Sequence, residues 1–207
     1  MRRKDDLAID KILECAKEEF LEKGYEGASM RTIAERAGYT TGMVYSRFAD
    51  KSQIFKELVE EGANKLFEYY SNIQKEFASF PIKRQVEEMH TYVEGKMDIM
   101  LDIIYDNFDA FKLIVTKSVG SGYEYYIDKM IDIETENTYR FIKQLKELGF
   151  QPKEIRADLS HMLASALFNG VFEIVAHDFP KEDASVYVKQ LQAFFNAGWD
   201  RLLFDSK

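Results

Sequence analysis

The order of apolar and polar residues near the start of the chain has the period of an amphipathic helix. Five apolar residues fall at positions i, i+3, i+4, i+7 and i+11 and so share one helical face: Ile9, Ile12, Leu13, Ala16 and Phe20. The pattern predicts a first helix over about residues 6–23. Gly24 then stands where a C-terminal cap belongs.

Two shorter helical segments follow, with a glycine between them. Ser29 is the expected N-cap of the second helix, which turns three apolar side chains inward: Ile33, Ala34 and Ala37. Gly38 then interrupts the chain, and Thr40 or Thr41 is the expected cap of a third helix. That helix carries one buried pair at spacing i, i+4: Val44 and Phe48.

A fourth, long helix is expected from Asp50 to about Phe77. Asp50 is its predicted N-cap, and Gln53, three residues later, resembles the second partner of a capping box. Phe80 precedes Pro81, and a residue before proline is pushed out of helical geometry, so the helix ends before this pair. Five more helices are predicted farther on, at about residues 82–103, 107–117, 122–148, 153–178 and 183–204. No segment alternates as a strand does, so the expected fold is all-α, with about nine helices.

The second and third helices have the outline of a helix-turn-helix, two short helices joined at a glycine. Ala34 is small enough for the helices to cross closely, Gly38 can take the positive φ of the turn, and Val44 fills the wedge between them. This spacing is also compatible with an ordinary helical hairpin. The pattern over residues 29–48 therefore favours a DNA-binding element without proving one.

The net charge of −8 is unusual for a protein that binds nucleic acid, so its distribution along the chain matters. Residues 1–51 hold ten Lys and Arg and ten Asp and Glu, and are neutral overall. The entire negative charge therefore belongs to residues 52–207. A neutral head can present a basic face to phosphate while an acidic body points away, so the charge permits DNA binding.

Catalytic, metal and membrane functions find little support in the composition. The single Cys15 excludes an internal disulfide and a Cys-based zinc cluster, and in a helix it is typical of a small buried apolar residue. The three histidines are too scattered for a metal site, and we find no Gly-rich phosphate loop and no Ser or Cys paired with a base.

The charged N-terminus lacks the apolar core of a signal peptide. The longest apolar stretch, residues 163–176, is shorter than a membrane span of about 20 residues, so a cytoplasmic protein without metal or cofactor is expected.

One continuous segment, Gly24–Lys51, resembles the DNA-binding signature of the TetR/AcrR family of transcription regulators. It reads GYEGASMRTIAERAGYTTGMVYSRFADK, and the matching first helix and fourth-helix start extend the likeness to about residues 6–66. The rest of the chain resembles the family only in length and helical architecture. The resemblance implies a DNA-binding head over residues 1–51 and a helical body for effector binding and dimerisation over residues 52–207.

The resemblance also implies which residues contact DNA. The third helix would be the recognition helix in the major groove, with its N-terminal end nearest the bases: Thr40, Thr41, Gly42 and Met43. Thr41 can hydrogen-bond a base edge, whereas Met43 offers only an apolar contact. The other implied contacts, joined by the first amides of the fourth helix, are mainly to phosphate: Ser29, Arg31, Tyr45, Ser46, Arg47 and Lys51.

Three residues depart from the family pattern. Tyr39 stands where a small aliphatic residue is usual, and its role is open. Arg47 stands where His or Tyr is usual, so it keeps or strengthens phosphate binding, and Ser46 replaces a commonly aromatic residue. Taken singly, Tyr45 can also be an aromatic at the edge of the core, and Arg47 and Lys51 can be solvated surface charges.

The last two predicted helices are apolar on more sides than one domain can cover. A helix that is apolar all round must be covered all round, so one face of these helices requires a partner. The resemblance implies that they form a four-helix dimer interface, in which two small residues spaced four apart allow close approach. The expected interface residues are Leu163, Ala166, Gly170, Phe194 and Trp199. A large monomeric core is the alternative.

Aromatic and methionine side chains gather in the middle of the predicted body, and they suit a pocket for a hydrophobic or cationic effector. The candidate ligand-binding residues are Met89, Tyr105, Phe108, Phe111, Tyr123 and Tyr126. A stripe of this kind is also typical of an ordinary core.

Together these features predict a homodimeric transcription regulator, a repressor that a small-molecule effector releases from a near-palindromic double-stranded DNA operator. Two other classes stay open. One is a dimeric helical ligand-binding or interaction module without a DNA-binding role. The other is an α-helical enzyme, for which we find no constellation of acid, base and nucleophile. Retention on a specific operator distinguishes the regulator from both.

Overall fold

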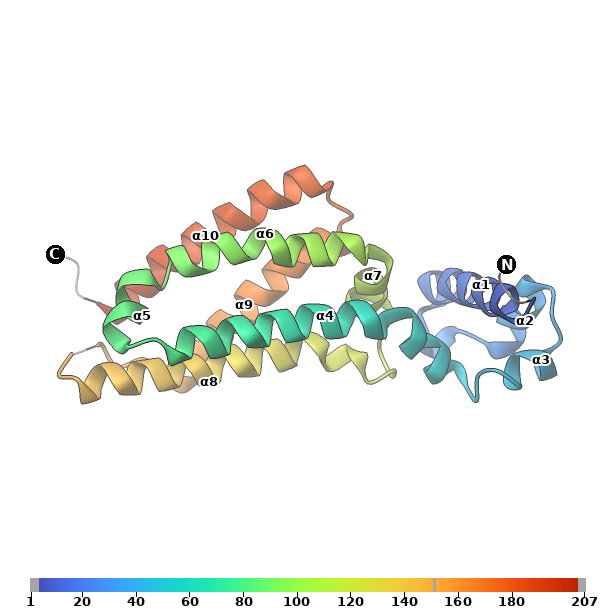
Figure 1. The fold of residues 1–207 in the computed structure, drawn as a ribbon, viewed down its shortest axis with the longest axis horizontal. Coiled ribbons are helices and arrows are strands. Elements are labelled where there is room, and N and C mark those ends of the chain that lie inside the picture. The colour runs from blue at the N-terminus through green and yellow to red at the C-terminus, as the bar shows by residue number, and fades with distance from the viewer. Residues whose placement is uncertain (1–3, 151, 205–207) are drawn as a thin grey trace. The chain divides into compact units, whose positions relative to one another are not determined.

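The computed structural model describes residues 4–150 and 152–204, and within them it contains ten α-helices, one short 3-10 helix and no strand (Figure 1). In chain order the elements are α1 (Lys4–Gly27), α2 (Met30–Ala37), α3 (Thr41–Tyr45), α4 (Lys51–Ser79), α5 (Ile82–Glu88), α6 (Thr91–Asp106), α7 (Phe108–Lys117), η1 (Tyr123–Tyr125), α8 (Tyr126–Glu147), α9 (Ala157–Ala176) and α10 (Lys181–Leu203). The all-α prediction is confirmed. The additional helix arises because a turn at Met89 and His90 divides the segment expected as one helix into α5 and α6.

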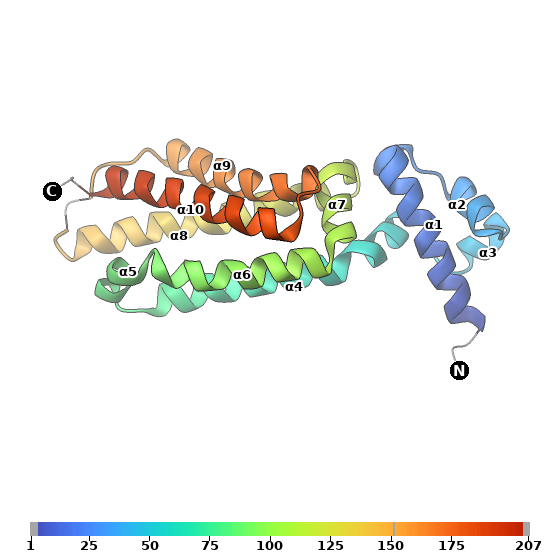
Figure 2. The same cartoon turned by 90° about the horizontal axis from the view of Figure 1, so that it is seen from above.

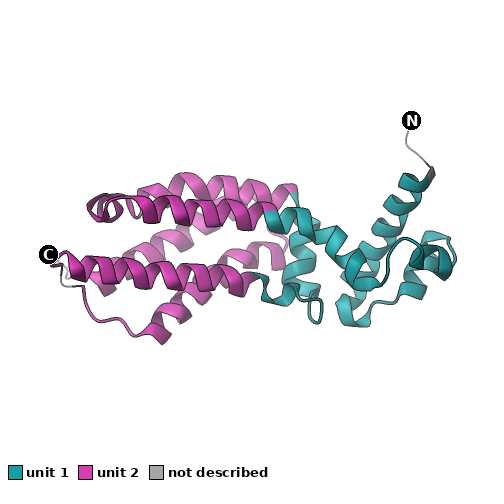
Figure 3. Ribbon diagram, turned by 60° about the horizontal axis from the view of Figure 1, so that its bottom comes forward, with its two compact units in different colours: residues 1–64, 107–126 teal, residues 65–106, 127–207 magenta. Residues whose placement is uncertain are grey.

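The chain divides into two compact units, which we describe separately (Figure 3). Unit 1 comprises residues 1–64 and 107–126, and unit 2 comprises residues 65–106 and 127–207. The domain boundary expected at residue 51 coincides with the start of α4. Unit 1 continues beyond it to residue 64, and it also includes α7 and η1, which lie much later in the sequence.

The core of unit 1 forms around the apolar face predicted for α1. Ile12, Ala16 and Phe20 are fully buried, and α1 packs on both α2 and α7. The ring of Phe20 meets the ring of Phe55 edge-on at 5.1 Å between centroids, a favourable aromatic geometry. An ion pair of 2.6 Å between Lys17 and Asp109 adds a polar contact between α1 and α7. These contacts explain why α7 belongs to unit 1.

The helix ends around the turn follow the sequence prediction. Gly38 has a φ of 75°, and its amide donates to the Glu35 carbonyl at 3.1 Å, so the glycine supplies the left-handed turn. Thr40 is the N-cap of α3, and its hydroxyl accepts the Met43 amide at 3.2 Å. Ser29 stands at the N-cap of α2, but its side chain makes no capping hydrogen bond.

Unit 2 contains the second part of α4 with α5, α6, α8, α9 and α10 (Figures 1 and 2). A hydrogen bond of 2.7 Å from Tyr70 to Glu134 connects α4 with α8, while α10 packs on α6 and α9. Buried residues of α9 fill the middle of the unit, among them Phe172 and Ile174. Unit 2 is therefore a helical bundle with its own apolar core.

Within the described ranges, α9 is the one helix long and apolar enough, by length and composition, to cross a membrane. The structure extends the apolar segment expected at residues 163–176 to 20 helical residues, Ala157–Ala176. Several of its side chains are buried inside unit 2, including Phe168, Val171 and Val175. A core helix of a water-soluble bundle has this composition too, so α9 is weak evidence for a membrane.

Candidate functional site

Helix α3 is anchored by one side and presents the other to solvent. Val44 is fully buried in unit 1, and Phe48, just after the helix, is 5% exposed. Tyr45 is 51% exposed. The remaining candidate contact residues of this segment are exposed at Thr40, Gly42 and Ser46 and half-buried at Thr41, Met43 and Arg47. The buried pair thus orients α3 so that a row of polar and small groups faces outward.

The hydroxyl groups of α3 and its cap differ in whether they already make a hydrogen bond within the protein. The Thr40 hydroxyl caps the helix by accepting the Met43 amide. The hydroxyls of Thr41 and Tyr45, by contrast, make no hydrogen bond with any residue in the described ranges. These two hydroxyls are available to a base edge and a phosphate.

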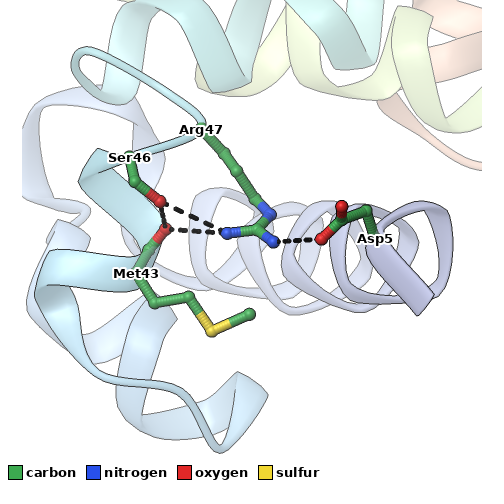
Figure 4. Close-up of polar contacts among 4 residues, drawn as sticks. All are labelled: Asp5, Met43, Ser46 and Arg47. Carbon is green, nitrogen blue, oxygen red and sulfur yellow. Dashed lines mark hydrogen bonds and ion pairs between the residues drawn. The ribbon is translucent and has the colours of Figure 1, made fainter.

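Ser46 and Arg47 fold back onto the end of α3 (Figure 4). The Ser46 hydroxyl donates to the Met43 carbonyl at 2.7 Å, and Arg47 Nη1 lies 3.4 Å from the same oxygen. Arg47 Nη2 also forms a 2.7 Å ion pair with Asp5 of α1. The arginine that the sequence assigned to phosphate is therefore partly engaged with a carboxylate of the same head.

Lys51 is engaged more completely. Its ammonium donates to the carbonyls of Tyr25, Glu26 and Ala28 at 2.7, 2.9 and 3.4 Å, and lies 4.7 Å from the centroid of the Tyr25 ring. An ammonium has three protons, and three carbonyls accept them here. Where the sequence predicted a phosphate contact, the structure shows hydrogen bonds that hold the end of α1 and the following Ala28 against the start of α4.

The first amides of α4, also expected at phosphate, are capped by the protein itself. Asp50 accepts the amides of Ser52 and Gln53 at 2.9 and 3.0 Å, and these hydrogen bonds, that of Gln53 first, lower the pKa of its carboxyl group. The Gln53 side chain accepts the Ala49 amide at 2.8 Å in return. The predicted capping box is confirmed, with the reciprocal bond one residue earlier than in the usual motif.

The other candidate residues of the head lie around α2. Arg31 is well exposed and forms an i, i+4 ion pair of 2.9 Å with Glu35, an arrangement that is easily exchanged for phosphate. Ser29 is half-buried at the start of the helix. Tyr39 is half-buried as well, and Lys11 of α1 lies 6.0 Å from its ring centroid. Tyr39 thus has a cationic neighbour within the head.

The candidate interface residues in α9 and α10 differ in their exposure: some face solvent and others face the interior of unit 2. Phe194 is 74% exposed, and Ala166 is exposed as well. Gly170 faces α10 of its own chain, since a Cβ atom there would lie 3.0 Å from Leu191. Leu163 and Trp199 are half-buried, and Trp199 lines an interior cavity. Other large apolar residues exposed on these helices were not among the predicted interface residues, chiefly Met162 at 68% and Val186 at 58%.

The six candidate ligand-binding residues are not brought together. Met89 lines the cavity of unit 2, while the Tyr105 hydroxyl donates to the Phe179 carbonyl at 2.7 Å. Phe108, Phe111, Tyr123 and Tyr126 belong to unit 1. Phe111 is fully buried beside Tyr126, whose hydroxyl donates to the Ala63 carbonyl at 2.9 Å. Phe111 and Tyr126 therefore belong to the core of unit 1, whereas Phe108 and Tyr123 are half-buried.

Unit 2 contains an interior cavity of ≈ 220 Å³, bounded by α4, α5, α6, α8, α9 and α10. Most of its wall is aliphatic, aromatic or methionine side chain, including Met89, Met97 and Met100 from the cluster noted in the sequence. Polar side chains also contribute to the wall, among them Gln74, Glu134 and Asn137. An apolar cavity with a few placed polar groups is the usual form of a small-molecule site.

Metal and thiol chemistry have no evident place in the parts of the chain that the structure describes. No group of three or more His, Cys, Asp or Glu residues there could hold a metal ion. Cys15 is half-buried, and burial raises the pKa of its thiol, which keeps it in the less reactive protonated form.

Comparisons with known proteins connect the head to one family. Residues 12–58 match the sequence model of the bacterial regulatory proteins of the tetR family. A regulator of the helix-turn-helix type from Bacillus subtilis, named YfiR and uncharacterised, is 26% identical over 180 residues, covering 84% of this chain and 82% of that protein. The repressor AcnR of Corynebacterium efficiens is 40% identical over 60 residues, 29% of this chain and 32% of AcnR.

A solved structure extends the likeness of the fold to the whole chain. A TetR-like transcriptional regulator from Rhodococcus sp. RHA1 superposes with a TM-score of 0.59 at 15% identity, covering 96% of this chain and 99% of that one. At this identity the agreement concerns architecture alone. Together with the matched head and its outward-facing α3, these likenesses support a DNA-binding transcription regulator that is similar to the tetR family in the sequence of residues 12–58 and in overall fold.

Proposed function

We propose that the protein is a homodimeric repressor whose two α3 helices bind a near-palindromic operator, and that a small molecule in unit 2 releases it. The free hydroxyls of Thr41 and Tyr45 on the outward side of α3 support the operator contact most directly. Repression is also the activity named for the Corynebacterium relative that matches the head. Acting on bacterial DNA, such a repressor works in the cytoplasm.

The operator contact is tested by selecting DNA fragments with the purified full-length protein and then scanning the selected site base by base. Thr41→Ala should lose about 1–3 kcal/mol at one base pair of each half-site and leave other positions unchanged. Tyr45→Phe should instead weaken binding to all sequences alike, because a phosphate contact carries no sequence information. Thr91→Ala, at an exposed threonine of unit 2, is the matched control. A protein that selects no sequence at all contradicts the proposal.

The exposed apolar surface of α9 and α10 supports the dimer. Met162, Val186 and Phe194 on these two packed helices are each more than half exposed, and several large apolar side chains exposed on one surface are typical of an interaction site. Two heads are needed to occupy two half-sites spaced by turns of the duplex. The dimer therefore brings Phe194 and Ala166 into the interface, whereas Gly170 and Trp199 support it from within their own chain.

The cavity of unit 2 supports the release by a small molecule. An engineered cavity of about 150 Å³ already binds benzene, so ≈ 220 Å³ suffices for a small aromatic ligand. A ligand shifts DNA affinity only through a difference in its own affinity for the two states, and the coupling is reciprocal. Operator DNA must therefore weaken the effector by the factor by which the effector weakens operator binding, usually about 5–150-fold.

A further inference from the structure

The charged side chains that line the cavity differ in whether they have a partner of opposite charge. Four ionisable residues other than tyrosine contribute to its wall: His90, Lys96, Glu134 and Arg140. Each of the three basic residues lies beside a carboxylate that is not part of the wall: His90 with Asp200 at 2.8 Å, Lys96 with Glu76 at 4.0 Å and Arg140 with Glu136 at 3.0 Å. The wall therefore offers no cation that still lacks an anionic neighbour.

Glu134 is the exception. It is half-buried, and within residues 4–150 and 152–204 no Lys, Arg or His lies within ion-pair distance of it. Burial raises the pKa of its carboxyl group, while hydrogen bonds from Tyr70 and Gln74 act in the opposite direction. A carboxylate removed from water is costly unless a counter-charge or hydrogen bonds offset the loss of solvation. Glu134 has only the hydrogen bonds.

Those hydrogen bonds fix one oxygen of Glu134 and leave the other open. Oε2 accepts from the Tyr70 hydroxyl at 2.7 Å and from Gln74 Nε2 at 2.6 Å. Asn137 Nδ2 donates to Gln74 Oε1 at 3.0 Å, which turns the amide so that its NH₂ group faces the carboxylate. No described residue donates to Oε1. The carboxylate is thus held in position before any ligand arrives.

The rest of the wall suits the apolar part of a cation. Aromatic rings contribute from five helices, α4, α6, α8, α9 and α10, among them Phe77, Tyr92, Phe141, Phe168 and Trp199. The electron-rich faces of such rings attract organic cations, with Trp the strongest of the three types. One wall residue already uses this contact, since Lys96 lies 5.2 Å from the Tyr92 ring centroid.

We propose that the cavity of unit 2 binds an aromatic or aliphatic organic cation, and that Glu134 is its counter-ion through the open Oε1. The proposal rests on the proposed function only in naming this ligand as the effector. Tyr70 and Gln74 are positioning residues that hold the carboxylate. A ligand with one ammonium or amidinium group satisfies the open oxygen of Glu134, and its ring or chain replaces solvent along the apolar wall.

The test compares three compounds that share one ring system and differ in charge. 1-Naphthylmethylammonium is cationic at pH 7.5, 1-naphthylmethanol is neutral and 1-naphthylacetate is anionic. Binding to the full-length protein is measured by calorimetry or by naphthalene fluorescence. The ammonium compound should bind at least tenfold more tightly than the alcohol, and the anion more weakly than both, because the carboxylate of Glu134 repels it.

Variants assign the preference to Glu134. Glu134→Gln keeps the shape and an acceptor for Tyr70, and should reduce the preference for the ammonium compound over the alcohol to less than threefold while the alcohol binds as before. Glu147→Gln, at an exposed carboxylate of the same helix, should leave the preference intact. Tyr70→Phe removes one donor to Oε2 and should lower the preference only in part.

Several outcomes overturn the ligand assignment. These are equal binding of the ammonium compound and the alcohol, a preference that survives Glu134→Gln, tightest binding of the anion, and no binding of the cation at millimolar concentration. Operator titration with each compound separates this inference from the proposed function. If the cation binds through Glu134 but leaves operator affinity unchanged, the ligand class stands and the regulatory role fails. If the alcohol or the anion releases the operator and the cation does not bind, the reverse holds.

Discussion

The paired charges of the DNA-binding head contrast with one charged residue in the cavity of unit 2, Glu134. In the head, Lys51 is bound by three carbonyls, Arg47 by Asp5, and Asp50 by two amides. In the cavity, Glu134 has no counter-charge among the residues that the structure describes. The paired charges of the head mainly fix the shape that presents α3, whereas Glu134 in the cavity remains open to a partner.

This contrast separates residues that build a surface from residues that contact a ligand. A satisfied charge adds to stability and cannot bind another group without first breaking a contact. An unsatisfied charge lowers stability until a partner arrives. Substitutions in the two regions should therefore change stability in opposite directions, and the predictions below test this from the largest expected effect to the smallest.

The largest effect is expected from Phe194→Glu, which tests the open surface of unit 2. Phe194 is 74% exposed, so a charge there should cost the folded monomer little, yet it should prevent a second chain from packing on α9 and α10. Light scattering should report a monomer, and operator affinity should fall toward its nonspecific level, a loss on the order of 10³-fold. Tyr139→Glu, at an aromatic of α8 that is 68% exposed, is the matched control. A Phe194→Glu protein that remains dimeric places the interface elsewhere.

Lys51→Met should give the next largest effect, through the fold of the head. Loss of the charged hydrogen bonds to the end of α1 and to Ala28 should lower the free energy of unfolding of the head by about 1.5–3 kcal/mol. It should also weaken binding to every DNA sequence. The slope of log affinity against log salt should stay the same, whereas loss of a phosphate contact would lower it by about 0.9. Thermal unfolding and salt-dependent titration measure the two quantities.

Lys56→Met, an exposed lysine on the same helix, serves as the control for charge. If the salt slope of Lys51→Met falls by about 0.9 while its stability is unchanged, Lys51 contacts phosphate and does not stabilise the head.

The local features of the fold could be predicted from the sequence. The buried face of α1, the turn at Gly38 and the caps at Thr40 and Asp50 depend on residues within one or two helical turns of one another. The contacts of Lys51 and Arg47 could not, because Lys51 reaches a connection 23 to 26 residues earlier and Arg47 a carboxylate 42 residues earlier. The family resemblance predicted that both residues contact phosphate, whereas in the structure both contact other residues of the head.

The ligand site was harder to predict than the head. Aromatic stripes have the same spacing in a core as around a cavity, so Phe111 and Tyr126 could not be distinguished from Met89 by pattern. A weak signal for the cavity was present in the polar residues on the inward faces of two helices. Tyr70 and Gln74 are spaced i, i+4, and Glu134 and Asn137 are spaced i, i+3, as residues of one helical face are. Only the pairing of the two helices shows that these residues form a network.

Glu134→Gln should change stability in the direction opposite to Lys51→Met. Burial raises the pKa of Glu134 above its usual value of 4.5, so the ionised carboxylate destabilises the folded state at neutral pH. The variant should unfold at a higher temperature than the wild type at pH 7.5. As the pH falls through the raised pKa, the folded wild type takes up a proton before the unfolded chain does, so the advantage of the variant should shrink. Melting temperatures measured between pH 5 and 8 test this, and a variant that is less stable at every pH would show that the carboxylate is fully satisfied.

The smallest effect is expected from Asp5→Asn, at the ion pair between Asp5 and Arg47 (Figure 4). Asp5 is largely exposed, and an exposed ion pair contributes only about 0.2–1 kcal/mol, so the melting temperature should hardly change. Removal of the carboxylate frees the guanidinium of Arg47 and removes a negative charge from the head, so affinity for operator and random DNA should rise about two- to fivefold, equivalent to less than ~1 kcal/mol. Glu14→Gln, farther along the same helix, controls for the change in net charge. If Asp5→Asn binds no more tightly than this control, Arg47 does not reach phosphate, and it belongs with Lys51 among the charges that only build the head.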